Sequence, residues 1–153
     1  MADPIKVPAS AGSETSVVSN DIRHFIWDRT IEDNPLELDL EFSDEEIGNA
    51  RRFCAMMCKD VPPYVIEINA SSIPKGFEYA FMIGTVYHLF LAKLMSLQRK
   101  DLDYSAGGMT VDINKRRIDY LSKWVVAFKQ EAMESIQKRK LSMNLESGYA
   151  HYY

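Results

Sequence analysis

Residues 79–92, YAFMIGTVYHLFLA, form the longest apolar run in the chain and decide its fold. Eleven of these fourteen residues are apolar, so a helix here carries apolar side chains around most of its circumference, as buried helices do. A membrane span needs about 20 apolar residues, and this run closes at Lys93. The run therefore predicts a central core helix, from about Phe77 to about Arg99, and no membrane span.

A second helix is expected before the central one. Ser43 in the N-cap position and Glu46 three residues later form a capping box, which predicts a helix that starts at Asp44. The proline pair at residues 62–63 ends this helix near Asp60, because proline cannot continue a helix.

The longest helix is expected from about Ile113 to about Lys140, a length of roughly 40 Å at 1.5 Å per residue. Tyr120 and Trp124 are expected to broaden its core-facing stripe on one side. The basic run at residues 138–140 suits the negative end of the helix dipole. The stripe itself consists of Ile113, Ile118, Leu121, Val125, Phe128, Ala132 and Ile136.

The remaining segments are shorter or irregular. Residues 36–42 alternate apolar and polar side chains, and residues 64–70 read as a short strand that could pair with them. Residues 1–20 lack the apolar core of a signal peptide and are typical of a flexible arm. The predicted fold is mainly α, a three-helix core bundle with short extended or β segments. It divides into the arm, a helical domain over residues 21–140 and an extended C-terminal tail, residues 141–153.

The stretch DYSAGGMTVDINKR, residues 103–116, places Gly107 and Gly108 before the longest helix. Glycine-rich loops that lead into helices often hold phosphate. Asp112, however, stands at the expected N-cap, where its carboxylate would accept from the first free N–H groups and repel an anion. The loop also lacks the Lys-Ser or Lys-Thr pair of a nucleotide-binding loop. We expect a tight turn with one glycine at positive φ, and no cofactor.

Catalytic and metal-binding patterns are absent from the sequence. Cys54 and Cys58, the only cysteines, are expected to be buried free thiols, because a disulfide framework needs more of them. Zinc would need a second cluster, which the scattered His24, His88 and His151 do not supply. His88 lies in the apolar run and is expected to be a hydrogen-bonded core histidine rather than a general base. We therefore expect neither catalytic residues nor a metal site.

Charge is unevenly distributed in this chain of net charge −4. Residues 1–50 hold 12 acidic and 3 basic side chains, whereas residues 115–140 hold 8 basic and 3 acidic ones. The acids of residues 28–46 alternate with apolar residues, as on a solvated face. A chain that is acidic in front and basic behind suits subunits that pack front to back.

The tail, LSMNLESGYAHYY, contains no run that predicts a helix and places three tyrosines among its last five residues. Such a segment leaves apolar area in water unless a partner covers it, and tyrosine gives a large contact area at low entropic cost. We interpret it as a docking tail; a tail that folds back on its own helices is the alternative. Its expected contact residues are Leu141, Met143, Leu145, Tyr149, Tyr152 and Tyr153.

Four features together resemble the head-to-tail adaptor, or connector, proteins of tailed bacteriophages. They are the segment IRHFIWDRTIEDNPLELDLEFSDEEI, the proline pair after its helix, the central apolar helix, and DYSAGGMTVDINKRRIDYL continuing into KRKLSMNLESGYAHYY. The resemblance covers residues 22–153 and lies in the order and spacing of the features. The arm, residues 1–20, is longer than in related patterns and has no assigned role.

The resemblance implies a structural protein of the virion, made in the host cytoplasm, and no enzyme. Such subunits form a ring, typically of twelve copies, that docks through its C-terminal segments onto the portal. The other partners implied are a tail-side neck or tail-terminator protein and double-stranded DNA, which passes through the ring without being read. Two alternatives stay open: a helical adaptor or regulatory subunit of a cellular complex, and a small enzyme whose site is made only on assembly.

Overall fold

Four α-helices make up the part of the chain that the computed structural model describes, which is residues 17–28, 41–62, 68–104 and 112–150. The described residues contain no strand, so the protein is mainly helical, as predicted. In chain order the helices are α1 (Ser19–Ile26), α2 (Asp44–Asp60), α3 (Glu78–Tyr104) and α4 (Asp112–Ala150).

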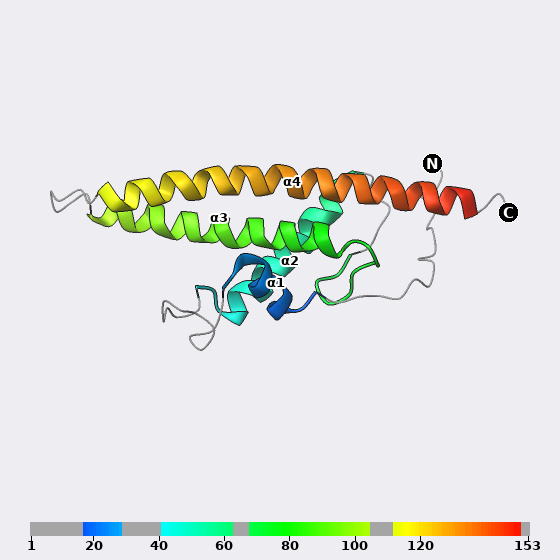
Figure 1. Cartoon of the computed structure of the whole chain (residues 1–153), viewed down its shortest axis with the longest axis horizontal. Helices are drawn as coiled ribbons and strands as arrows, with labels where there is room; N and C mark the ends of the chain where they lie inside the picture. The colour runs from blue at the N-terminus through cyan, green and yellow to red at the C-terminus, as the bar shows by residue number, and fades with distance from the viewer. Residues whose placement is uncertain (1–16, 29–40, 63–67, 105–111, 151–153) are drawn as a thin grey trace, which may run out of the picture.

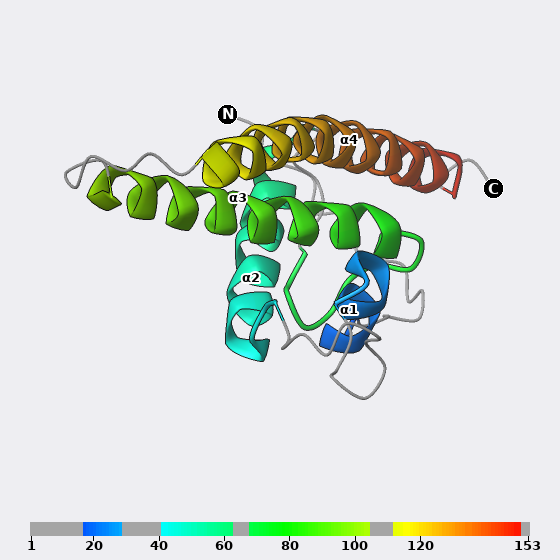
Figure 2. The same cartoon turned by 60° about the vertical axis from the view of Figure 1, so that its left-hand side comes forward.

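The helices stack in layers around α3. Figure 1 shows α3 and α4 side by side and antiparallel, with the C-terminal end of α4 continuing past the start of α3. Figure 2 shows α1 below α3, on the side away from α4, and α2 crossing α3 so that its C-terminal end reaches α4. Accordingly, α3 packs most extensively against α4 and then against α2.

The central helix α3 begins where the sequence predicted but ends five residues later, at Tyr104. Phe77 directly before it and Phe81 in its first turn are fully buried, and Val86 and Leu89 continue the buried set. By length and composition alone, the segment Glu78–Arg99 could cross a membrane, because it contains an 18-residue window with a mean hydropathy of 1.5. A core helix of this kind passes the same test, and 44% of that apolar window is buried within the fold.

Both boundaries of α2 follow from the signals in the sequence. The Ser43 hydroxyl accepts from the backbone N–H of Glu46 at 3.2 Å, and the Glu46 carboxylate accepts from the backbone N–H of Ser43 at 2.7 Å. Phe42 and Ile47 on either side of this cap are both buried, as a hydrophobic staple requires. The helix ends at Asp60, before the prolines, so the predicted capping box is confirmed.

Helices α2 and α3 meet closely at Gly84. A Cβ atom on Gly84 would lie 2.5 Å from the Sγ atom of Cys54 and 3.0 Å from the terminal methyl group of Met57. Cys54 and Cys58 are both free and fully buried at this contact, as predicted. The absence of a side chain at Gly84 therefore sets the distance between the two helices.

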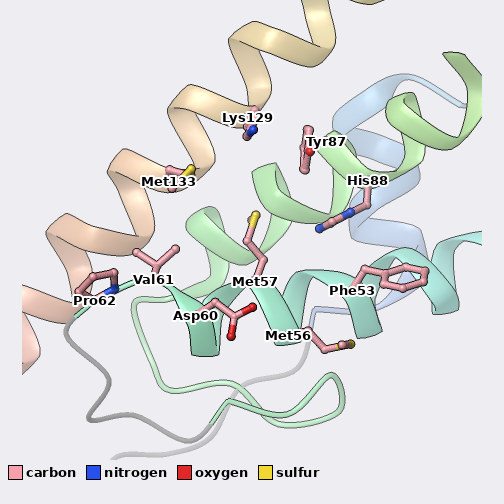
Figure 3. Close-up of a pocket in the computed structure, with 10 residues that line it drawn as sticks. All are labelled: Phe53, Met56, Met57, Asp60, Val61, Pro62, Tyr87, His88, Lys129 and Met133. Atoms are coloured by element: carbon pink, nitrogen blue, oxygen red, sulfur yellow. The ribbon is translucent and has the colours of Figure 1, made fainter. Parts of the chain in front are cut away.

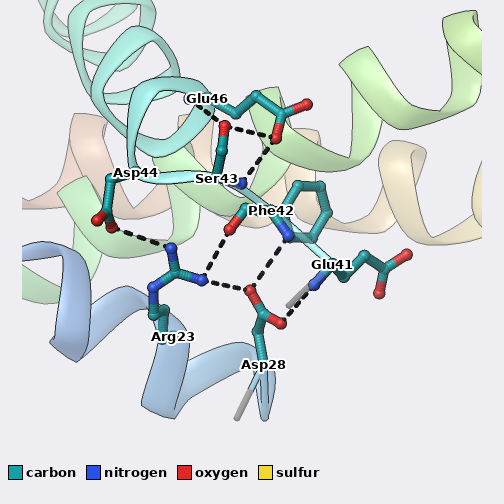
Figure 4. A network of polar contacts seen from close by, with 7 residues as sticks. All are labelled: Arg23, Asp28, Glu41, Phe42, Ser43, Asp44 and Glu46. Atoms are coloured by element: carbon teal, nitrogen blue, oxygen red, sulfur yellow. Dashed lines mark hydrogen bonds and ion pairs between the residues drawn. The ribbon is translucent and has the colours of Figure 1, made fainter. Parts of the chain in front are cut away.

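Helix α1 was not predicted, and Val17 just before it is buried, so the last four residues of the predicted flexible arm are ordered into the fold. One polar network joins α1 to the start of α2 (Figure 4). The Arg23 guanidinium donates to the carboxylate of Asp28 and to the carbonyl of Phe42, both at 2.7 Å, and to Asp44 at 2.9 Å. The Asp28 side chain is only 5% exposed and accepts from the backbone N–H of Glu41 at 2.8 Å. Asp28 is thus a buried structural carboxylate, and the prediction that it belongs to a solvated face was wrong.

The predicted stripe of α4 is correct in its centre and too broad at one edge. Val125, Ala132 and Ile136 are buried, but Tyr120 is 65% and Trp124 is 56% exposed. At about 100° per residue, Trp124 lies about 80° around the helix from Ala132, which turns it away from α3. An antiparallel helix pair buries a narrower stripe than a helix surrounded on several sides.

Helix α4 continues ten residues beyond its predicted end, to Ala150, so the expected extended tail at residues 141–150 is helical. Arg139 forms an ion pair with Glu146 at 3.2 Å and donates to the hydroxyl of Ser142, which ties successive turns together. It also donates to the backbone carbonyl of Lys75 at 2.9 Å. The basic run at residues 138–140 therefore does not mark a helix end; Arg139 and Lys140 bind neighbouring segments, and Lys138 pairs with Glu134 of the same helix.

Lys140 is the clearest case of such binding. Its side chain is fully buried, and its ammonium group donates to the carbonyl of Val61, the residue that follows α2. Burial lowers the pKa of Lys140 from its usual range. The contact fixes α4 to the C-terminal end of α2, where a positive charge complements the helix dipole.

The two segments predicted to be extended fall largely outside the described residues, since residues 29–40 and 63–67 are not among them. At the end of the second segment, Asn69 exchanges backbone hydrogen bonds of 3.2 Å with Ser72 and closes a turn. Their predicted pairing therefore stays a prediction.

Candidate functional site

The residues predicted to form a docking tail lie on or beyond the last turns of α4. Leu141 and Leu145 are exposed and lie one turn apart on the same side of the helix. Met143 faces inward and packs against the core. Tyr149 belongs to α4 with its side chain outside the described residues, and Tyr152 and Tyr153 lie outside them entirely. The described part of the tail thus presents a leucine pair, Leu141 and Leu145, on a helix.

A second apolar surface is an open hollow of about 400 Å³ between α2, α3 and α4 (Figure 3). Phe53 and Met56 of α2 are 55% and 60% exposed there, although both are large apolar side chains. Asp60 from α2 and Lys129 from α4 contribute opposite charges on the two sides of the hollow. The hollow is also lined by Met57, Tyr87, His88 and Met133.

His88 lies in this hollow, with its ring centroid 5.8 Å from that of Phe53 and 4.7 Å from that of Tyr87. Its Nε2 atom is buried and has no hydrogen-bond partner among the described residues. The predicted hydrogen bond of a core histidine is therefore not made by Nε2. Burial lowers the pKa of His88. The neutral form of the imidazole is therefore favoured at pH 7.

A third surface, which we call the aromatic flank, consists of Tyr120 and Trp124 on α4. The Trp124 ring stacks on Phe128 at 5.5 Å, and Phe128 stacks on Phe90 of α3 at 5.6 Å. The Lys123 ammonium group lies 5.9 Å from the centroid of the Tyr120 ring. These contacts fix the orientation of two exposed aromatic rings, which is typical of residues that anchor protein interfaces.

The predicted turn and cap residues are only partly described. Helix α4 begins at Asp112, one residue before the expected start, but the side chain of Asp112 lies outside the described residues. Gly107 and Gly108 lie outside them as well. The reading of this loop as a turn without a bound phosphate therefore stays a prediction.

Reactive groups in the described part of the chain are not gathered into a site. No group of three or more His, Cys, Asp or Glu residues that could hold a metal ion occurs among the described residues. The hydrogen bond with Cys58 and burial raise the pKa of the Cys54 thiol well above its ordinary value. Cys54 also donates to the carbonyl of Phe81 at 3.3 Å, so this thiol is protonated and serves packing.

Sequence reasoning missed the hollow, because its members come from three helices whose relative positions are not visible in the sequence. The only local signal was the set of apolar residues Phe53 and Met56 outside the inward stripe of α2. A scan against protein-family models found no match, and neither did searches of curated proteins and of solved structures.

Proposed function

We propose that this chain is a head-to-tail adaptor of a tailed bacteriophage, a structural subunit that forms a ring beneath the portal and joins the head to the tail. The observation that carries the proposal is the end of α4. This helix of 39 residues, about 58 Å long, continues past the start of α3 and presents the exposed leucine pair there. A stiff helix with exposed apolar residues near its end suits a subunit that inserts into a neighbouring protein.

The anchoring of α4 supports this role. Lys140 binds the end of α2, and Arg139 binds the segment before α3, directly before the leucine pair begins. A load on the projecting end is therefore passed to the body of the subunit through two buried or half-buried cations. In the neck, the leucine pair and the tyrosines that follow it would lie against the portal. The body of each subunit would be its bundle of three core helices.

The net charge of the chain supports a ring through which DNA passes. The chain has a net charge of −4, which favours passage of double-stranded DNA over its retention. Twelve copies are expected from the resemblance, with a tail-side neck or tail-terminator protein on the opposite rim. The subunit is made in the host cytoplasm, acts in the virion and needs no cofactor for this role.

The test is binding to the portal protein encoded in the same genome. The double variant Leu141→Ser, Leu145→Ser should keep the helical circular dichroism and lose portal binding in co-sedimentation, because both side chains are exposed in the free subunit. Met95→Ser is the matched control, since Met95 is an exposed apolar residue near the other end of α3. If the leucine variant binds the portal as the unaltered chain does, docking by this end of α4 is wrong.

The alternative function is a helical adaptor or regulatory subunit in a cellular complex. The leucine pair and the aromatic flank would serve such a role equally well, because neither selects a portal by its chemistry. Lack of binding to the portal by the unaltered chain, together with a stable complex with a host protein, would favour this alternative.

A further inference from the structure

Two exposed surfaces lie on opposite flanks of α4. Met133, which lines the hollow, is nine residues from Trp124 of the aromatic flank. At about 100° per residue, nine residues correspond to two and a half turns, so the two side chains leave the helix in opposite directions. The subunit thus carries an apolar hollow on one side and a pair of aromatic rings on the other.

The two surfaces are complementary in shape. The hollow is concave and lined by flexible methionines, whose thioethers adapt to an inserted ring and make favourable contacts with it. The aromatic flank is convex, because Tyr120 and Trp124 stand out from a helix surface and are held there by Lys123 and Phe128. Each surface alone leaves large apolar side chains in water.

The charges of the two surfaces are complementary as well. The hollow has Asp60 on its α2 side and Lys129 on its α4 side. The aromatic flank has Lys123 beside Trp124 and, two turns along, Glu131, whose carboxylate accepts from the Tyr79 hydroxyl. Each surface therefore offers one acid and one base, so a docked orientation that opposes Asp60 to Lys123 and Lys129 to Glu131 would pair opposite charges.

We propose that the aromatic flank of one copy docks in the hollow of the next copy of this chain. The contact is heterologous: it uses two different surfaces, so every docked copy still presents a free hollow at one end and a free aromatic flank at the other. Repetition by a constant rotation closes such a contact into a ring. This inference rests on the proposed function, since it supplies the subunit contact of the ring beneath the portal.

The test uses one variant for each surface and the solution mass of the full chain, measured with and without the portal. Trp124→Glu removes the flank, with Tyr120→Glu as a second variant because Trp124 also stacks on Phe128. Met56→Glu removes the hollow. Each variant should associate with itself at least about thirtyfold more weakly than the unaltered chain, as expected for central interface residues. Met95→Glu, at an exposed site outside both surfaces, should assemble normally.

An equimolar mixture of Trp124→Glu and Met56→Glu gives the sharpest result. The first variant keeps an intact hollow and the second keeps an intact flank, so the mixture should form a particle of two 17.5 kDa chains and nothing larger. Variants that assemble like the unaltered chain, or a mixture that stays monomeric while the unaltered chain assembles, would overturn the contact. An unaltered chain that stays monomeric both alone and with the portal would also overturn it.

Two further variants test the pairing of Asp60 with Lys123 across the contact. Asp60→Lys should weaken assembly, and Lys123→Glu added to it should restore part of the loss, because the pair is then reversed. Equal weakening in the double and single variants would overturn the docked orientation. The contact and the proposed function can fail separately. If the unaltered chain assembles through this contact but does not bind the portal, the proposed function is wrong and the contact is retained. If both surface variants still form rings that bind the portal, the contact is wrong and the proposed function is retained.

Discussion

Replacement of Gly84 by alanine tests the close contact between α2 and α3. The added Cβ atom would lie 2.5 Å from the Sγ atom of Cys54 and 3.0 Å from the Cε atom of Met57. The methionine end is flexible and can move aside. The Cys54 sulfur is fully buried and bound to the carbonyl of Phe81, so it cannot move without loss of that contact.

The expected magnitude follows from two opposing effects. Insertion of a methyl group into a packed contact costs about 1–3 kcal/mol. Alanine is favoured over glycine in a helix interior by about 0.5–1 kcal/mol. Gly84→Ala should therefore lower the free energy of unfolding by about 0–2.5 kcal/mol, which corresponds to a Tm up to roughly 10 °C lower for a chain of this size.

Gly48→Ala is the matched control, because Gly48 lies inside α2 with no atom within 4 Å of an added Cβ. It should raise stability by about 0.5–1 kcal/mol through helix propensity alone. Urea unfolding followed by circular dichroism measures both changes. Addition of Cys54→Ala should remove the clash, so the cost of Gly84→Ala should be smaller in that background. A Gly84→Ala protein as stable as the Gly48→Ala protein would refute the reasoning.

Three further predictions concern single side chains. Ser43→Ala should cost about 0.5–2 kcal/mol in urea unfolding by loss of the cap of α2, and an unchanged midpoint would contradict the role of the capping box. Lys140→Met should cost about 1–3 kcal/mol because the buried carbonyl of Val61 loses its donor, whereas a gain would show that burial of the charge dominates. Burial lowers the pKa of His88 in the folded state below its ordinary value of 6.5, so its neutral form stabilises the fold above about pH 6.5 and this contribution is lost as the pH falls through the folded pKa. His88→Gln should therefore show a smaller fall in Tm between pH 7 and pH 5 than the unaltered chain, and equal falls would rule out His88 as the titrating group.

Local signals predicted the middle of the fold. A capping box and two prolines bound α2, and an apolar run marks α3, because caps and helix periodicity act within a few residues of where they stand in the sequence. Helix α1 was missed because its support comes from elsewhere: Arg23 reaches Phe42 and Asp44, about twenty residues away. No local pattern reveals such a partner.

The end of α4 was missed for a related reason. The residues after Lys140 include serine, asparagine and glycine, which favour helix ends. Contacts overrode this preference: Arg139 links to Glu146 across two turns, and Met143 packs against the core. The same change of structure turned the predicted docking residues Leu141 and Leu145 from an extended segment into one side of a helix.

The sequence contains the residues of the hollow, but it does not reveal that they lie at one surface. Met56 and Met133 are 77 residues apart in the chain, and only the placement of α2 and α4 on α3 brings them to one surface. Trp124 was assigned to the core because it continues an apolar stripe. Its exposure follows from a fold in which α4 packs against one helix along most of its length.

The mass of the complex between this chain and the portal encoded in the same genome tests the central claim most directly. The claim predicts that the portal particle gains several copies of the 17.5 kDa chain, twelve if the ring has the expected symmetry, and that the gain disappears with the Leu141→Ser, Leu145→Ser variant. A portal particle of unchanged mass at saturating concentrations of the unaltered chain would contradict it.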